Sequence, residues 1–273
     1  MLFASDLDGT LIFSRRYLES MGKSKIKRIR SIEEIDGKET SYISQTVIEK
    51  LKFLNNKAFF VPVTTRSLHQ YNRITLFKNE IKPHYAIISN GGIILEKGVP
   101  MMEWQLKIQD RLSKQLINRD VVLRKFEETK ASKWVTSMKE VDGLFVYFLL
   151  DREKIQREEL NPFLKWLKKK AWTGSLQGRK LYLIPNCINK RDPVLFLMKK
   201  IGQNHFASAG DSFLDLPMLM AADYKIIPSH GELVECLGES LKKEGIKYTC
   251  RRGIDASEEI VDFGISLLED HHS

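Results

Sequence analysis

The sequence predicts an α/β protein: a central parallel sheet with helices on both faces, and a small α+β domain inserted into it. Three observations predict this fold. Short apolar runs that are typical of buried strands alternate with amphipathic helical stretches. Acidic and hydroxyl-bearing motifs directly follow several of these runs. A segment in the middle of the chain breaks the alternation that its flanks follow.

The strands and helices of the core are predicted from apolar periodicity. Five short apolar runs are expected to form buried strands, namely residues 2–5, 59–63, 85–88, 205–209 and 224–227. Residues 40–55 have the period of a helix and place on one face Ile43, Val47, Leu51 and Leu54. Residues 192–201 do the same, and Pro193 suits the first turn of that helix.

Two regions interrupt the core. The first is a predicted flap after the first strand, residues 28–43, where Asp36-Gly37 between two strand-like runs is a strong hairpin signal. The second is an α+β insertion formed by residues 96–178, which contain helical stretches at 104–118 and 152–170 and strand-like ones at 134–138 and 144–150. Residues 1–95 and 179–273 then form the core, with hinges near Gly98 and Gly178.

The composition bounds the partners of the chain. A formal net charge of +9 favours anionic partners, either a phosphorylated small molecule or nucleic acid. The basic cluster at residues 23–30 either attracts such a partner or protects an exposed strand edge. No apolar run is long enough to cross a membrane. The three cysteines form no CxxC pair, which indicates a reducing, cytoplasmic location.

The first motif is Asp6-Leu7-Asp8-Gly9-Thr10, directly after the first apolar run. Ligands of open α/β sheets bind beyond the carboxyl ends of the strands, and this is such an end. Two carboxylates there repel each other unless a hard cation with oxygen ligands compensates them. The alternative is an ordinary turn, because Asp-Gly sequences are common in turns.

Three weaker motifs follow in order. Thr64-Thr65-Arg66-Ser67 comes after the second run, where a hydroxyl can donate to a phosphoryl oxygen or simply cap a helix. Lys190 precedes a helix and is a compact cation suited to phosphate, although most lysines are only solvated. Asp211 and Asp215 follow the fourth run, four residues apart, and could share one face of a helix as metal ligands. The alternative is that Asp211 or Ser212 caps that helix.

Taken together, these motifs resemble those of the haloacid dehalogenase (HAD) superfamily. The match rests on their order and on their positions at strand ends, namely DLDGT at 6–10, TTRS at 64–67, Lys190 and GDSFLD at 210–215. TTRS, SNGG at 89–92, RKLYLIP at 179–185 and GDSFLDLPML look closest to the branch of Cof-type sugar phosphatases and sucrose-phosphate phosphatases. That branch has a Rossmann-like core and carries its cap domain between the second and third motifs, where the insertion is predicted.

The resemblance implies a phosphatase for a small, sugar-like phosphorylated metabolite. Asp6 would attack phosphorus and become an aspartyl-phosphate, and Asp8 would be the acid and base. Thr64 and Lys190 would neutralise the phosphoryl oxygens. Mg²⁺ would be held by Asp6, the backbone carbonyl of Asp8 and Asp211, with Asp215 either a further ligand or an orienting residue. The substrate-binding residues implied are Thr65, Arg66, Asn90 and Gly91.

Two departures from the family pattern affect the substrate more than the reaction. Thr65 stands where many relatives have glycine, and Leu214 where they often have asparagine. Two alternative functions remain at this point. One is a phosphomutase of phosphomannomutase type, which returns the phosphoryl group to a sugar. The other is a nucleic-acid-binding protein on an inactive HAD fold, although the chain has none of the common nucleic-acid motifs.

Overall fold

The chain divides into two compact units. The structure, a computed structural model, describes residues 1–20 and 28–270. The first unit consists of Met1–Met101 and Asn189–Ser273, and the second of Met102–Ile188. Among the helices described, none combines the length and the apolar character needed to cross a membrane.

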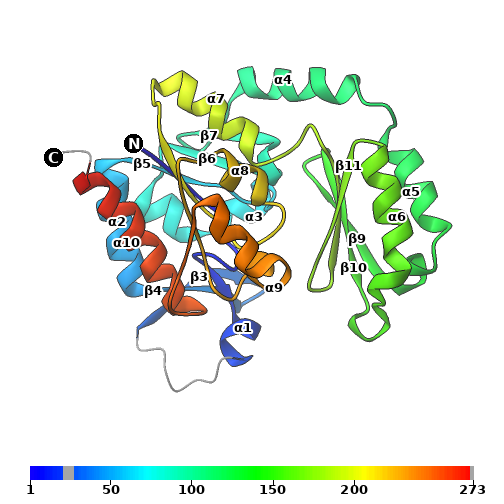
Figure 1. Cartoon of the computed structure of the whole chain (residues 1–273), viewed down its shortest axis with the longest axis horizontal. Helices are drawn as coiled ribbons and strands as arrows, with labels where there is room; N and C mark the ends of the chain where they lie inside the picture. The colour runs from blue at the N-terminus through cyan, green and yellow to red at the C-terminus, as the bar shows by residue number, and fades with distance from the viewer. Residues whose placement is uncertain (21–27, 271–273) are drawn as a thin grey trace. The chain divides into compact units, whose positions relative to one another are not determined.

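The first unit is built on a five-stranded parallel sheet (Figure 1). In spatial order its strands are β15 (Ile246–Tyr248), β14 (Tyr224–Ile227), β13 (Phe206–Ala209), β1 (Leu2–Ser5) and β5 (Phe59–Pro62). All four residues of β1 are buried. A parallel strand with both faces covered has no solvent side, so it reads as a continuous apolar run and not as an alternation.

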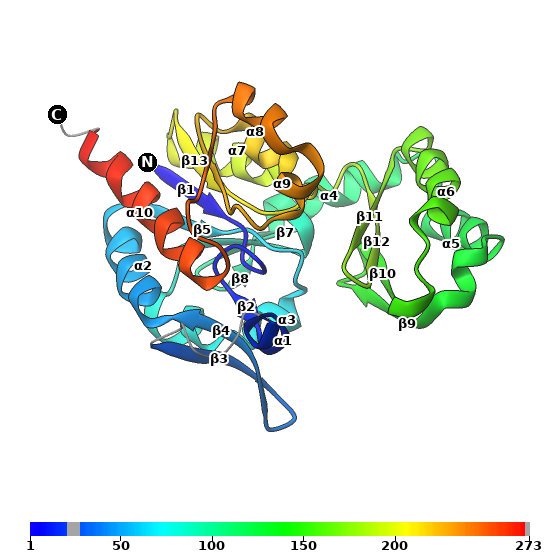
Figure 2. The same cartoon turned by 60° about the horizontal axis from the view of Figure 1, so that its bottom comes forward.

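Helices cover both faces of this sheet (Figures 1 and 2). On one face α2 (Gln45–Lys57) packs against α10 (Ile254–Asp270). On the other face α7 (Arg191–Ile201) packs against α8 (Leu216–Ala221). The predicted α/β class is therefore confirmed. The unit also contains α1 (Arg15–Ser20), α3 (Leu68–Asn72), α9 (Glu232–Leu237), a π-helical turn at Phe77–Ile81 and 3₁₀ turns at Ser89–Gly91 and Gly238–Glu244.

Two small antiparallel sheets complete the first unit. The flap sheet consists of β2 (Phe13–Ser14), β4 (Lys38–Ser44) and β3 (Ile29–Ile35), and the other of β6 (Tyr85–Ile88), β7 (Ile93–Glu96) and β8 (Val99–Pro100). Asp36 and Gly37 join β3 to β4 with φ of 51° and 73°, so the predicted hairpin is confirmed.

The second unit packs an antiparallel sheet against helices. The sheet has the order β11 (Trp172–Gln177), β12 (Lys180–Pro185), β10 (Phe145–Leu150) and β9 (Val135–Val141). The helices are α4 (Met102–Ser113), α5 (Arg119–Glu127) and α6 (Arg157–Lys169), with 3₁₀ turns at Lys130–Trp134 and Arg152–Lys154. Phe126 of α5 packs against both Phe148 of β10 and Phe163 of α6 in one apolar cluster. This is the α+β architecture expected of the insertion.

Some predicted boundaries were wrong. The helix expected over 40–55 begins only at Gln45, because residues 38–44 pair with β3, and Ile43 therefore belongs to a strand. The helical stretch 104–118 is α4, which ends at Ser113, and α5 was not predicted. Tertiary pairing overrode a local helical pattern in the first case.

The second unit also has other limits than the expected 96–178. It extends to Ile188 because β12 pairs with both β10 and β11. Gly178, expected near a hinge, has φ of 57° and turns the chain between β11 and β12 inside this unit.

Candidate active site

The motifs gather at one edge of the parallel sheet. Ser5 pairs with Pro62 on one side and with Ala209 on the other, so β5, β1 and β13 end at the same level. Asp6 continues this register by donating its N–H to the carbonyl of Ala209 at 2.9 Å. The side chains that follow the three strands therefore start from one edge, as the strand-end argument predicts.

Lys190 lies at the centre of this edge. Its Nζ donates hydrogen bonds to Oδ1 of Asp6 at 2.6 Å and to Oδ1 of Asp215 at 2.5 Å. The Lys190 side chain is 1% exposed, and that of Asp215 is 0% exposed. A buried ammonium needs such partners, because burial without them favours its neutral form. The carboxylates raise the pKa of Lys190 despite its burial, which keeps the side chain charged.

Negative charge exceeds positive charge around Asp6. Burial raises the pKa of Asp6 to about 7; Lys190 opposes this shift, and the nearby charge of Asp215 adds to it. Burial, followed by the charges of Asp6 and Asp215, also raises the pKa of Asp211 well above its usual value. A further positive charge at this place would therefore stabilise the ionised carboxylates.

The loop after β13 is organised by Asp215. Its Oδ2 accepts hydrogen bonds from the N–H of Asp211 at 3.1 Å, and from the N–H and hydroxyl of Ser212 at 2.9 and 2.8 Å. Asp215 thus holds Lys190 with one oxygen and the Asp211 loop with the other. Gly210 fits here because a Cβ at this position would lie 2.4 Å from the Cβ of Asp215.

The carboxylates of this cluster suit a hard divalent cation. One oxygen from each of Asp6, Asp211 and Asp215 lies within 4.8 Å of the others. A ligand set made only of oxygen atoms is what Mg²⁺ and Ca²⁺ take, whereas zinc and copper sites use nitrogen or sulfur. The donor chemistry and the excess of negative charge both fit a bound magnesium ion.

The Asp8 side chain is held elsewhere, by Arg66. The guanidinium grips it in a fork, with Nε donating to Oδ2 and Nη2 to Oδ1, both at 2.8 Å. Arg66 also donates from Nη1 to Glu33 of β3 at 2.9 Å and from Nη2 to the hydroxyl of Ser41 of β4 at 3.1 Å. The structure therefore ties Arg66, expected to bind substrate, to a carboxylate of the first motif and to the flap.

Sequence reasoning missed Glu33 and Arg73. Arg73 donates from Nε to Oε1 of Glu33 at 2.9 Å, so that Glu33 lies between two guanidinium groups. The sequence shows Glu33 only as one of two adjacent glutamates in a strand-like run, and it indicates neither its burial nor its partners. The partners are set by how the flap folds back onto the loop after β5.

Thr64 and the SNGG segment form a supporting layer. Thr64 is fully buried, and its Oγ1 accepts the N–H of Arg66 at 3.1 Å, which leaves the hydroxyl proton available as a donor. Ser89 and Asn90, with φ of 52° and 54°, direct their N–H groups to the carbonyls of Arg66 and Thr64. A Cβ on Gly91 would lie 2.1 Å from the carbonyl oxygen of Asn189, so only glycine fits beside the Lys190 loop.

The residues predicted to bind the substrate support the loops of the site through these contacts. Asn90 and Gly91 are buried and pack the loop after β5 against the Lys190 loop, while Thr65 is half-buried. Contact of Thr65, Asn90 and Gly91 with a substrate stays a prediction.

A histidine outside the predicted set anchors the first motif. The N–H of Gly253 donates to Nδ1 of His230 at 2.9 Å, so the ring proton is on Nε2 and faces the carbonyl of Gly9, also at 2.9 Å. The ring packs beside Phe13 and Tyr17. His230 thereby links the turn after Asp8 to the segment before α10.

The structure describes only some of the basic residues at 23–30. Lys25 and Lys27 lie outside the described residues. Arg30 pairs with Glu80, which also accepts a hydrogen bond from Lys52 at 2.7 Å. Exposed pairs of this kind contribute little to stability, and the role of the cluster stays open between its two explanations.

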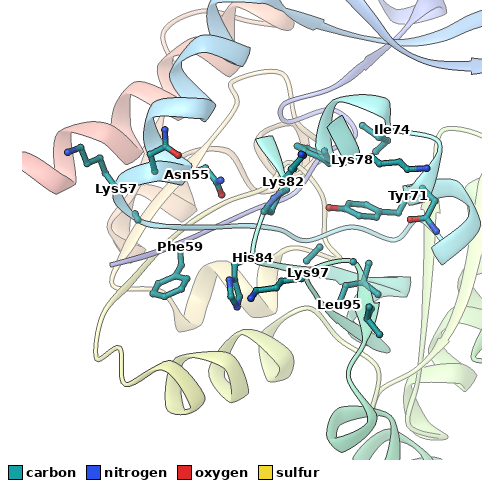
Figure 3. Close-up of a pocket in the computed structure, with 18 of the residues that line it drawn as sticks. Asn55, Lys57, Phe59, Tyr71, Ile74, Lys78, Lys82, His84, Leu95 and Lys97 are labelled. Atoms are coloured by element: carbon teal, nitrogen blue, oxygen red, sulfur yellow. The ribbon is translucent and has the colours of Figure 1, made fainter. Parts of the chain in front are cut away.

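A cavity of about 1010 Å³ lies in the first unit, away from the motifs (Figure 3). It is lined by the start of β5 at Phe59, whereas Thr64 follows the other end of that strand. Its lining includes four lysines, Lys57, Lys78, Lys82 and Lys97, and none of the motif carboxylates. The chemistry therefore belongs to the carboxyl edge of the sheet and not to this cavity.

Comparison with known proteins agrees with the motif assignment. Residues 1–253 match the family described as sucrose-6F-phosphate phosphohydrolase. Among curated proteins, no sequence is similar enough to this chain to count as a match.

Solved structures with the same fold include two sugar phosphatases and a HAD/COF-like hydrolase. The sucrose-phosphatase from Synechocystis, solved with sucrose and phosphate, has a TM-score of 0.68 at 16% identity and covers 97% of this chain and 98% of its own. A HAD subclass IIB sugar phosphatase has a TM-score of 0.61 at 16% identity, with 99% and 98% covered. A HAD/COF-like hydrolase from Plasmodium vivax has a TM-score of 0.64 at 14% identity, with 97% and 95% covered.

Proposed function

Since the chain belongs to the sucrose-6F-phosphate phosphohydrolase family of HAD phosphoric monoester hydrolases, we propose that it hydrolyses a small sugar phosphate with Mg²⁺ through an aspartyl-phosphate on Asp6. One observation carries the proposal. The buried Lys190 ammonium joins Asp6 to Asp215 at the strand edge where Asp211 also lies. This arrangement places a nucleophile, a fixed positive charge and an oxygen-ligand cluster within one site.

In the first step, a carboxylate oxygen of Asp6 attacks phosphorus. The bond between phosphorus and the sugar oxygen breaks, and that oxygen takes a proton from the carboxyl group of Asp8. Asp8 suits this part because its side chain is 50% exposed, whereas that of Asp6 is 8% exposed. The accessible carboxyl group exchanges protons with substrate and water, and the buried one forms the covalent bond.

In the second step, the ionised Asp8 takes a proton from water. The water oxygen attacks phosphorus, the bond from phosphorus to Asp6 breaks, and inorganic phosphate leaves. Both carboxyl groups then have their starting protonation, because Asp8 regains the proton that it gave to the sugar. The same residue serves as acid and then as base, as in other double-displacement hydrolases.

Fixed donors neutralise the phosphoryl group during both steps. Lys190 supplies a full positive charge, and the Thr64 hydroxyl has its proton available because its oxygen already accepts the N–H of Arg66. Asp6, the Asp8 carbonyl and Asp211 would hold Mg²⁺, which would supply positive charge against the phosphoryl oxygens. Asp215 is fully buried, with Lys190 bonded to its Oδ1 and three further donors bonded to its Oδ2, which favours an orienting role for it over that of a ligand.

The two alternative functions are not favoured. A phosphomutase would share the first step but return the phosphoryl group to a sugar, and the family that matches the chain is named for hydrolysis. A nucleic-acid-binding role does not need the buried Lys190 cluster, whereas phosphoryl transfer does.

The test is a screen of sugar phosphates, including sucrose 6-phosphate, with Mg²⁺ and ¹⁸O-labelled water. The proposal expects inorganic phosphate that carries one labelled oxygen. A phosphomutase yields an isomeric sugar phosphate without label. The proposal fails if the wild-type enzyme, like the Asp6→Asn variant, releases phosphate from none of the esters.

A further inference from the structure

The flap approaches the proposed acid and base through a buried glutamate. Along the chain of contacts from Glu33 through Arg66 to Asp8, the side chains are 3%, 11% and 50% exposed. The Glu33 end is therefore enclosed by protein, and the Asp8 end is open to substrate and water. An enclosed group can fix the direction of Arg66, and the Arg66 fork in turn fixes the direction of the Asp8 carboxylate.

A β-bulge turns Glu33 toward Arg66. In the pairing of β3 with β4, the register shifts on both sides of Glu33. Ile32 and Glu33 are consequently both buried, although neighbouring residues of a regular strand point to opposite faces. Bulges of this kind redirect side chains and are frequent beside active sites. Glu34, the next residue, is exposed.

Glu33 is fully engaged in this position. It accepts hydrogen bonds from Arg66 and Arg73, each at 2.9 Å, and from the Ser41 hydroxyl at 2.5 Å. Burial acts to raise the pKa of Glu33, but Arg66, Ser41 and Arg73 together hold it below its usual value. The carboxylate is thus charged, and its negative charge offsets the repulsion between the two guanidinium groups that it contacts.

We propose that Glu33 is a positioning residue for Asp8: it fixes the Arg66 guanidinium so that the Arg66 fork holds the Asp8 carboxylate in place for proton transfer. This rests on the proposed function, in which Asp8 protonates the sugar oxygen. Without Glu33, Arg66 keeps only Asp8 and the Ser41 hydroxyl as side-chain partners in the described structure, beside the charge of Arg73. The guanidinium and Asp8 then sample several orientations, and few of them suit proton transfer.

The variant that tests this is Glu33→Gln, which keeps the shape of the side chain and removes its charge. The matched control is Glu34→Gln, which removes the same charge from the adjacent, exposed position of the same strand. Each enzyme is assayed with a sugar phosphate, whose leaving group is an alkoxide, and with p-nitrophenyl phosphate. The alkoxide leaving group needs a proton from Asp8, whereas the nitrophenolate leaves without one.

Because kcat/KM reports only the steps up to formation of the phosphoenzyme, it isolates the acid role of Asp8. We expect Glu33→Gln to lower kcat/KM for the sugar phosphate by about 10-fold or more, a part of what general acid catalysis contributes. The value for p-nitrophenyl phosphate should change by less than about 3-fold, as should both values for Glu34→Gln. Ser41→Ala should also lower kcat/KM more for the sugar phosphate than for p-nitrophenyl phosphate, but by a smaller factor. It removes one hydroxyl that contacts both Glu33 and Arg66.

Equal losses on both esters would mean a general structural effect and would overturn the inference, as would unchanged kinetics. A crystal structure of Glu33→Gln gives an answer that does not depend on activity. The inference expects the Arg66 fork to be displaced from Asp8, and a fork retained as in the wild type overturns it. A wild-type enzyme inactive on every ester would count against the proposed function, while the crystal structure would still decide whether Glu33 positions Arg66.

Discussion

Lys190 donates a hydrogen bond of 2.6 Å from its Nζ to Oδ1 of Asp6, and both side chains are almost completely buried. The two residues come from loops that lie 184 positions apart in the chain. Lys190 also bonds Asp215, so one ammonium serves two carboxylates. Its loss would leave two buried negative charges without their counter-ion, which makes Lys190 important for stability as well as for phosphate binding.

Replacing Lys190 by Met is expected to affect both properties. Turnover should fall by at least about 100-fold, as for the loss of a preorganised donor to the transition state. The free energy of unfolding should fall by about 3 kcal/mol, because an ion pair is broken by removal of one partner. Phosphate release and urea denaturation measure the two effects. Lys199→Met, at an exposed position of α7, the helix that follows Lys190, should change neither. A fully active Lys190→Met variant would exclude this role.

Asp6→Asn is expected to abolish the reaction. An amide does not attack phosphorus, so turnover should fall by at least about 10³-fold. Wild-type enzyme quenched in acid after exposure to labelled substrate should retain label on protein, and the variant should retain none. Asp36→Asn, in the flap turn, serves as the control and should behave as the wild type. Activity of Asp6→Asn within a few-fold of the wild type would remove Asp6 from the mechanism.

Metal removal tests the carboxylate cluster. EDTA should abolish activity and Mg²⁺ should restore it, whereas Ca²⁺ should support it poorly because it takes more ligands at longer distances. Binding also has a readout apart from activity, since a ligand that binds only the folded state raises its Tm. Mg²⁺ should raise the Tm of the wild type and have a much smaller effect on Asp211→Asn. An equal increase for both proteins would place the ion elsewhere.

The fold class and the strand ends could be predicted because they depend on local chemistry. β1, β6 and β14 have the predicted limits because each is a short, largely apolar run. β6, however, pairs antiparallel with β7 and lies outside the five-stranded parallel sheet. The same strand ends bring Asp6 and Asp211 to one edge of the sheet. The family assignment, made from the motifs at these ends, is confirmed by the match over residues 1–253.

Features that depend on pairing could not be predicted from one sequence. Residues 40–44 fit both the helical period and a strand, and their pairing with β2 and β3 decides between them. Glu33 faces Arg66 because of a bulge, and a shift of one residue would have turned it to the other side of the strand. One sequence therefore does not show that Arg66 meets Glu33, and contact of Arg66 with a substrate stays a prediction.

His230 provides a prediction about pH. Burial lowers the pKa of His230 below its usual value, and Nδ1 accepts the N–H of Gly253 only while the ring is neutral. A base whose pKa is lower in the folded state binds its proton more readily in the unfolded chain. Its contribution to stability is therefore complete above the unfolded pKa of about 6.5 and is lost as the pH falls through the lower folded value.

His230→Ala should reveal this contribution as a difference between two titrations. At pH 7.5 the variant should be less stable by about 1–2 kcal/mol, because the N–H of Gly253 and the carbonyl of Gly9 both lose a partner. As the pH falls from 7.5 toward 5, the difference in urea midpoint between wild type and variant should shrink, since only the wild type loses the His230 bond. Subtraction removes the titration of every other group that both proteins share. A difference that is constant or grows toward pH 5 would contradict a neutral, Gly253-bonded His230 in the folded protein.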